Sequence, residues 1–185
     1  MAGGYVSVDN NNGVWKAPAN ISLINVKAPA IAISDDEQAA LNVDVITGKS
    51  INVIRYFTGR GTVIWGARTL AGNDNEWRYI SVRRFFNMVE ESVQKAIQAF
   101  TFEPNDINTW ITVKSMIDNF LLLLWKAGAL QGTKPQEAFF VHVGPGETMT
   151  AQDILNGRMI IQIGMAPSRP AEFIVITISQ IMHGN

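Results

Sequence analysis

Apolar residues recur along the chain with two different periods, and each period predicts a different secondary structure. Between residues 82 and 100 they recur every three or four positions, which predicts an amphipathic helix. A second pattern of this kind covers about 107–127 and stops at Gly128, a residue type that commonly ends helices. A break at 103–105, which contains a proline, separates the two patterns. Because this link is short, the two helices are expected to form an antiparallel hairpin.

Alternation of apolar and polar positions, the period of a β-strand, marks several shorter segments. Residues 51–57 and 62–65 lie on either side of a Gly-Arg-Gly turn, which predicts a β-hairpin. Residues 138–143 and 158–165 predict two further strands. Residues 2–8 alternate in the same way and are also expected to be a strand.

Two capping patterns predict short helices between these strands. Ser34 is followed three residues later by Glu37, and Thr150 is followed three residues later by Asp153. In each pair the two side chains can cap the first turn of a helix reciprocally. Residues 20–33, interrupted by a proline, are expected to form short strands or extended chain.

The last strand-like run, residues 172–182, differs from the others because its centre is apolar on both faces. Alternation gives one face Phe173, Val175 and Thr177 and gives the opposite face Ile174, Ile176 and Ile178. A strand with two apolar faces needs cover on both sides. An unpaired edge of this length and apolarity is also an aggregation hazard. The run is therefore expected to pair inside its own sheet or to insert into the sheet of a neighbour.

The order of the elements is strands, then helices, then strands, which predicts an α+β fold. We expect a mixed β-sheet covered by the helical hairpin, with extended terminal arm strands. At 185 residues the chain fits one domain with extended arms. Residues 1–20 are expected to form an N-terminal arm or linker, 21–170 the core domain, and 171–185 a C-terminal arm strand.

Composition narrows the possible function classes. The formal net charge of −1 gives no overall field that would attract nucleic acid or an anionic membrane. The longest purely apolar run, 120–125, is far too short to span a bilayer. Without cysteine the chain can form no disulfide, thiol nucleophile or thiolate metal site. Apolar residues at 47% and charged residues at 17% slightly favour a subunit that buries surface against partners.

Candidate groups for chemistry are few. His142 lies in a predicted strand and His183 in the terminal tail, without neighbours at metal-ligand spacing, so both are interpreted as packed or solvated histidines. The glycine-containing turns near 59 and 144 lack the Lys-Ser/Thr pair of a phosphate-binding loop. The acidic residues at 35–37 are explained by the start of a helix. No catalytic, cofactor-binding or metal-binding residue is predicted.

A series of short segments is more specific than the composition. They are Gly-Val-Trp-Lys-Ala-Pro-Ala-Asn at 13–20, Ile-Asn-Val-Ile-Arg at 51–55, Gly-Ala-Arg-Thr-Leu at 66–70, Trp-Arg-Tyr-Ile-Ser-Val-Arg-Arg at 77–84, Phe-Glu-Pro-Asn at 102–105, Gly-Ala-Leu-Gln-Gly at 128–132 and Pro-Ala-Glu-Phe at 170–173. In this order they resemble the C-terminal region of contractile tail sheath proteins from phages, R-type pyocins and related contractile injection systems.

The resemblance implies a structural subunit that polymerises helically around an inner tube and contracts to drive the tube through a target envelope. The implied partners are other sheath subunits, the inner tube protein and the baseplate, with no nucleic acid, no membrane insertion and no cofactor. The implied location is a virion tail or contractile injection particle, assembled in the bacterial cytoplasm. Family members are usually considerably longer, so this chain is expected to correspond to the C-terminal sheath domain.

The resemblance also implies roles for particular residues. Terminal arms of sheath proteins add strands to the sheets of neighbouring subunits. The residues expected in this inter-subunit strand are Glu172, Phe173, Ile174, Val175, Ile176, Thr177, Ile178 and Ile181. Contact with the inner tube is expected from a charged helix or loop, for which Asp153 and Arg158 are the candidates.

Two other interpretations stay open at this point. The first is a baseplate or adaptor module that uses the same domain for docking without contraction. The second is an enzyme with an unrecognised site, for which the sequence provides no positive indication.

Overall fold

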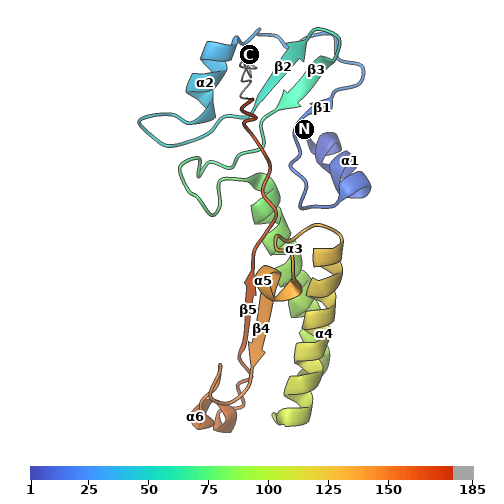
Figure 1. The fold of residues 1–185 in the computed structure, drawn as a ribbon, viewed down its shortest axis with the longest axis vertical. Helices are drawn as coiled ribbons and strands as arrows, with labels where there is room; N and C mark the ends of the chain where they lie inside the picture. Colours follow the sequence, from blue (N-terminus) through green and yellow to red (C-terminus); the bar gives the residue numbers. More distant parts are fainter. Residues whose placement is uncertain (177–185) are drawn as a thin grey trace, which may run out of the picture.

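The computed structural model describes residues 1–176 and shows an elongated molecule with two parts (Figure 1). Residues 1–79, in the upper half of Figure 1, contain a small β-sheet and are called the sheet lobe below. Residues 80–168, in the lower half, contain two long helices side by side and are called the hairpin lobe. The C-terminal segment then runs from the hairpin lobe back to the sheet lobe.

The sheet lobe is built on an antiparallel sheet with the strand order β1-β3-β2. Its strands are β1 (Ile21–Ser22), β2 (Val53–Phe57) and β3 (Gly61–Trp65). Strands β2 and β3 pair along their whole length. Gly59 and Gly61 in and beside their turn have φ angles of 78° and 74°, which glycine adopts without steric cost. The predicted β-hairpin is therefore confirmed, whereas β1 is the one strand that forms in the segment 20–33.

The prediction of a strand at residues 2–8 is wrong, because this segment belongs to the helix α1 (Ala2–Asn12). Tyr5, Val8 and Asp9 lie on one face of α1, at the spacing of a helix turn, and Val8 is buried there. The guanidinium of Arg84 donates two hydrogen bonds to the Asp9 carboxylate and lies over the Tyr5 ring, 5.2 Å from its centroid. Contacts with a distant residue thus decide the structure of a segment whose own pattern is ambiguous.

Helix α2 (Asp35–Asn42) begins with the predicted capping box. The Ser34 hydroxyl accepts a hydrogen bond from the Glu37 backbone N–H at 3.3 Å. In return the Glu37 carboxylate accepts one from the Ser34 N–H at 2.8 Å. The hydrogen bond from the Ser34 N–H, followed by one that the Ser34 hydroxyl donates to the same carboxylate at 2.8 Å, holds the pKa of Glu37 below its usual value.

The hairpin lobe is organised by α3 (Ile80–Ile97) and α4 (Ile107–Lys126), which lie antiparallel as predicted (Figure 1). A single 3-10 turn, η1 (Gln98–Phe100), extends α3, and the Asp106 carboxylate caps α4. The facing stripes of the two helices form the main hydrophobic core, with Phe85, Val89 and Val93 from α3 and Val113, Ile117 and Leu121 from α4. In the described part of the chain, no helix combines the length and apolarity needed to cross a membrane.

A two-stranded antiparallel sheet of β4 (Phe139–Val143) and β5 (Ile161–Met165) packs against this hairpin. The short helix α5 (Pro135–Ala138) precedes β4, and α6 (Ala151–Leu155) lies between the two strands. Val141 of β4 is buried in the hairpin core, and its carbonyl accepts a hydrogen bond from Lys114 Nζ of α4 at 2.8 Å. Both predicted strands and the short capped helix are therefore confirmed.

The α+β fold class is confirmed, but the expected single mixed sheet is replaced by two separate antiparallel sheets. The alternation of apolar residues locates each strand without identifying its partner. Residues 66–138, which include α3, α4 and α5, separate β3 from β4 along the chain, and the strands before and after the hairpin pair among themselves. The helical hairpin consequently covers the second sheet rather than the whole molecule.

The core of the hairpin lobe gives a direct test of this packing. Leu121→Ala should lower the free energy of unfolding by about 2–5 kcal/mol, because it leaves a cavity at a fully buried position. Leu123→Ala is the matched control on the same helix, 66% exposed, and should change it by less than about 0.5 kcal/mol. Urea unfolding followed by circular dichroism measures both values. Equal losses for the two variants would contradict the observed orientation of α4.

Candidate interaction site

The segment after β5 is fixed to the hairpin lobe by backbone hydrogen bonds. The Ala166 N–H donates to the Ala138 carbonyl at 2.8 Å, and the Gln131 N–H donates to the Ala166 carbonyl at 2.8 Å. Ser168 donates its N–H to the Ala129 carbonyl at 2.9 Å and its hydroxyl to the Gly128 carbonyl at 2.7 Å. The chain is thus held firmly as far as Ser168, beside the end of α4.

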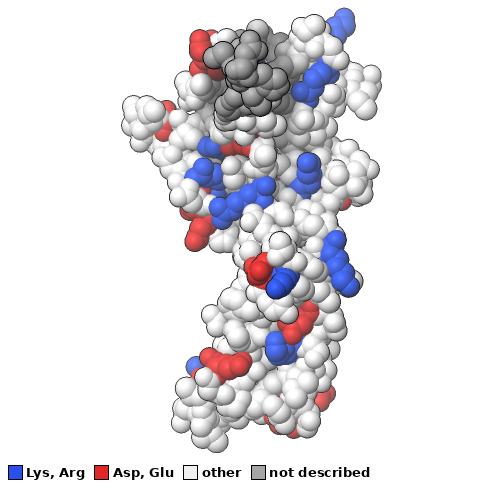
Figure 2. Space-filling view, viewed as in Figure 1, with Lys and Arg blue, Asp and Glu red and all other residues white. Residues whose placement is uncertain are grey.

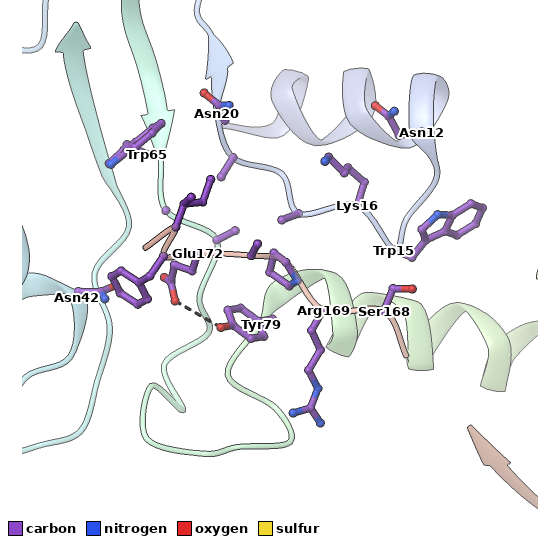
Figure 3. Close-up of a pocket in the computed structure, with 18 of the residues that line it drawn as sticks. Asn12, Trp15, Lys16, Asn20, Asn42, Trp65, Tyr79, Ser168, Arg169 and Glu172 are labelled. Atoms are coloured by element: carbon purple, nitrogen blue, oxygen red, sulfur yellow. Dashed lines mark hydrogen bonds between the residues drawn. The ribbon is translucent and has the colours of Figure 1, made fainter. Parts of the chain in front are cut away.

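Four residues further on, Glu172 binds the sheet lobe through an ion pair with Arg68. Arg68 Nη2 lies 2.6 Å from Glu172 Oε2, and Arg68 Nε lies 2.9 Å from Glu172 Oε1. Tyr79 donates a further hydrogen bond to Glu172 Oε2 at 3.4 Å (Figure 3). The Arg68 side chain is 6% exposed and that of Glu172 is 22% exposed. The geometry is the bidentate fork that makes arginine–carboxylate pairs strong and directional.

Beyond Glu172 the described chain has no cover. Phe173, Ile174, Val175 and Ile176 are 71%, 82%, 87% and 78% exposed. None of the described residues 173–176 belongs to a strand of this chain, so the first of the two alternatives for 172–182, pairing within its own sheet, is not seen there. Insertion into the sheet of a neighbour stays a prediction. Thr177, Ile178 and Ile181 of the predicted inter-subunit strand, and His183, lie outside the described residues.

A groove of about 1050 Å³ lies where this segment meets the sheet lobe (Figure 3). Its lining includes Trp15 and Trp65 of the sheet lobe and Phe173 and Ile174 of the C-terminal segment. Some of its polar side chains are paired with one another; for example, Arg55 donates to the Asp35 carboxylate at 2.7 Å. Within residues 1–176 no three His, Cys, Asp or Glu side chains come close enough to hold a metal ion. The lining of the groove thus joins apolar side chains of the sheet lobe to those of the C-terminal segment.

Of the two histidines considered in the sequence, His142 is the one that lies within the described residues. Its Nδ1 lies 3.4 Å from the Glu147 carboxylate, and its ring centroid lies 4.9 Å from that of Phe140. The side chain is about half exposed on β4. These contacts agree with the interpretation of His142 as a packed surface residue.

Asp153 and Arg158 come together at the opposite end of the molecule, at α6, with 3.9 Å between the Arg158 Nη1 and the Asp153 Oδ1. The Asp153 carboxylate accepts hydrogen bonds from the Thr150 hydroxyl at 2.6 Å and the Thr150 N–H at 3.0 Å. These bonds, the hydroxyl one first, lower the pKa of Asp153. Asp153 thus holds the start of α6, whereas Arg158 is 68% exposed and points its charge to solvent.

Phe102, which lies at the tip of the helical hairpin, was not predicted as a functional residue, although it begins the Phe-Glu-Pro-Asn segment. The Glu103 N–H donates to the Phe100 carbonyl at 3.2 Å, Thr101 has φ −65° and ψ 128°, and Phe102 has φ 72°. This is a type II turn, whose third position favours glycine or asparagine. The Phe102 ring is fully exposed, so neither the backbone nor the side chain explains a phenylalanine here. No local sequence signal identifies such a position, because Phe-Glu-Pro is an ordinary helix break.

Charge on the visible face of the molecule is mixed. Figure 2 shows Lys and Arg side chains spread from one end of this face to the other, with Asp and Glu among them. Several of the arginines are used in internal contacts: Arg68 pairs with Glu172, Arg84 with Asp9 and Arg55 with Asp35. Internal ion pairs therefore use the charge of these three arginines.

Comparison with known proteins identifies the family. The family model described as the phage tail sheath C-terminal domain matches residues 72–181, which is more than half of the chain. The chain therefore belongs to the phage tail sheath C-terminal domain family. The resemblance inferred from the ordered sequence segments is confirmed.

Solved structures extend the likeness to almost the entire chain. The sheath complex of PVC, an extracellular contractile injection system, in its contracted state matches 97% of this chain with 46% identity and a TM-score of 0.92. A chain of the anti-feeding prophage (AFP) baseplate matches 98% with 50% identity and a TM-score of 0.89. The tail sheath protein of Vibrio phage KVP40 is 28% identical over 130 residues, 70% of this chain.

The relatives are longer than this chain. The match covers 49% of the PVC chain, 49% of the AFP chain and 19% of the KVP40 protein. The chain thus spans about half the length of the solved relatives.

Phe102 allows a test of whether its turn is strained. Phe102→Asn should raise the free energy of unfolding by about 0.5–1 kcal/mol, because asparagine adopts the left-handed conformation more readily and the exposed ring contributes no packing. Phe100→Asn, two residues earlier, should lower it by more than about 1 kcal/mol, because Phe100 packs against the hydrophobic core. Thermal unfolding of both variants measures the effects. A loss of stability in Phe102→Asn would show that the ring supports the fold.

Proposed function

We propose that this chain is the C-terminal domain of a contractile sheath subunit, which polymerises helically around an inner tube and contracts to drive the tube through a target envelope. The observation that carries the proposal is the match of 97% of the chain, at 46% identity, to the PVC sheath in its contracted state. The AFP helical sheath in its contracted state gives a similar match, with 50% identity and a TM-score of 0.88. The proposed location is a contractile particle or virion tail, assembled in the bacterial cytoplasm.

The exposed C-terminal segment is proposed to be the arm that links one subunit to the next. Its four described apolar side chains lose solvent contact only if another molecule covers them. At roughly 1.5–3 kcal/mol for each side chain buried, this cover would be worth several kcal/mol before the costs of association. Addition of the arm to a neighbour's sheet would also satisfy its backbone hydrogen-bonding groups. Thr177, Ile178 and Ile181 continue the same arm in this proposal.

Such an arm explains a helical array and a contraction without a bound nucleotide. A surface that pairs with a different surface of an identical neighbour does not close on itself, so it generates a filament. Contraction would move the domains as rigid bodies while the arms keep them connected. The energy would be stored in the assembled state, and no catalytic activity or cofactor is proposed.

Contact with the inner tube is proposed at the end of the molecule that carries α6. Arg158 would supply an exposed cation for an acidic group of the tube, and Asp153 would position it by capping the helix. Other sheath subunits and the baseplate are the remaining proposed partners, since one matching chain belongs to an AFP baseplate structure. Docking at a baseplate without contraction is the second candidate; the matches to contracted sheaths favour the first.

The proposal is tested by replacing the matching half of the PVC sheath protein with this chain. The chimera should form helical tubes of sheath diameter in negative-stain electron microscopy. Discrete rings or monomers from a folded chimera would contradict a contractile sheath and favour the docking module. Resolving extended and contracted forms of the tubes would then measure contraction directly.

The arm is tested by a deletion of residues 173–185 in the same chimera. Because residues 173–176 are exposed, their deletion should leave the melting temperature nearly unchanged and abolish tube formation. Ile174→Asp should weaken assembly in the same way, whereas Ile46→Asp, at a position 89% exposed in the sheet lobe, should not. Normal tubes from the deletion variant would exclude the arm as the link, and unfolding would assign residues 173–185 to the domain's own core.

A further inference from the structure

We propose that the Arg68–Glu172 ion pair anchors the C-terminal arm to the body of the domain and fixes the point from which the arm departs. In an assembled sheath, a pull on the arm would then enter the sheet lobe through Arg68. This inference rests on the proposed function, because it assigns the anchor of the arm that is proposed to link subunits. It concerns two residues whose connection is visible only in the fold, since 104 positions separate them.

The pair differs from the other ion pairs in the described residues. Its cation is the least exposed of all, at 6%, whereas Asp35 in the Arg55–Asp35 pair is 91% exposed. Removal from water strengthens the attraction between the two charges, and the bidentate geometry restricts their relative movement. A surface ion pair such as Arg55–Asp35 is expected to restrain its partners far less.

Arg68 is itself held rigidly against β2. Its backbone N–H donates to Asn52 Oδ1 at 2.8 Å, and its carbonyl accepts from Asn52 Nδ2 at 2.7 Å. The Asn52 side-chain amide thus forms the two hydrogen bonds that a neighbouring strand would form with the backbone of Arg68. A Cβ at Gly66 would lie 2.9 Å from Asn52 Cα, so the glycine permits this close approach. Arg68 also forms an isolated β-bridge with Tyr79, the second residue that binds Glu172.

The ion pair divides the C-terminal segment into a fixed part and an exposed part. Ser168 is bonded to the hairpin lobe, Glu172 to the sheet lobe, and every described residue after Glu172 is exposed. Without the pair, the last fixed point would be Ser168. The arm would then gain four residues, which extend at most about 14 Å.

Four additional free residues matter for assembly, because the arm acts as a tether between subunits. A longer free segment lowers the effective concentration of the arm at the neighbour's sheet. It also lets subunits separate before the tether becomes taut. Glu172, the first residue of the predicted inter-subunit strand, is therefore a positioning residue, because it sets the origin and length of the arm that continues from it.

The anchor can be measured in the isolated chain, independently of assembly. The chain has no cysteine, so spin labels can be placed at Tyr56→Cys on β2 and Phe173→Cys beside the anchor, both exposed positions. The distribution of distances between the two spin labels should be narrow in the chain that carries only the two cysteines. It should widen by up to about 14 Å when Glu172→Gln is added. Asp35→Asn, which breaks the exposed Arg55–Asp35 pair, should leave it narrow. An unchanged distribution in Glu172→Gln would overturn the proposal even if the sheath assembles as proposed.

The consequence of additional free residues is measured in the chimeric sheath with two matched insertions of four Gly/Ser residues. An insertion between Glu172 and Phe173 lengthens the arm beyond its anchor and should raise the protein concentration needed for tube formation by about two- to threefold. An insertion between Arg169 and Pro170 lies before the anchor and should leave that concentration unchanged. Glu172→Gln should behave like the first insertion while its circular dichroism spectrum stays that of the parent. Equal effects of the two insertions would contradict the anchor, whereas failure of the unaltered chimera to form tubes would count against the proposed function.

Discussion

The burial of the facing apolar stripes of α3 and α4 is the interaction on which the rest of this structure depends. The two helices meet through side chains that are almost completely removed from water. Their packing gives β4 a surface to lie on, and β4 in turn gives β5 its only partner strand in the described chain. The same hairpin ends in Gly128 and Ala129, whose carbonyls hold Ser168. The position of the C-terminal segment therefore follows from a hydrophobic core made by two helices.

A second, polar connection joins this segment to the sheet lobe. Hydrophobic burial sets no precise direction for a single extended chain, because it scales with area and is not directional. The carboxylate of Glu172 and the fork of Arg68 fix both position and direction. The segment is held by the hairpin lobe at Ser168 and by the ion pair at Glu172, so the chain beyond Glu172 departs from the domain at a defined point. A defined point of departure suits a linker between rigid bodies.

Features set by neighbouring residues could be predicted from the sequence, and features set by distant ones could not. The helical hairpin, the β2–β3 hairpin and the two capping boxes depend on residues within a few positions of one another. The helix at residues 2–12 depends on Arg84, and the place of Glu172 depends on Arg68, 104 positions away. The ordered segments nevertheless identified the family, because their order carries information that no single segment has.

Two places in the described chain break local rules of sequence and structure. Phe102 puts a bulky aromatic ring at a left-handed turn position and exposes it fully, and residues 173–176 expose four apolar side chains in succession. Proteins tend to tolerate such inconsistencies where a function compensates for them. One lies at the tip of the hairpin and the other beside the sheet lobe, near opposite ends of an elongated domain (Figure 1). A subunit that contacts different partners at its two ends would relieve both inconsistencies in the assembled particle, which places the reason for them outside the isolated chain.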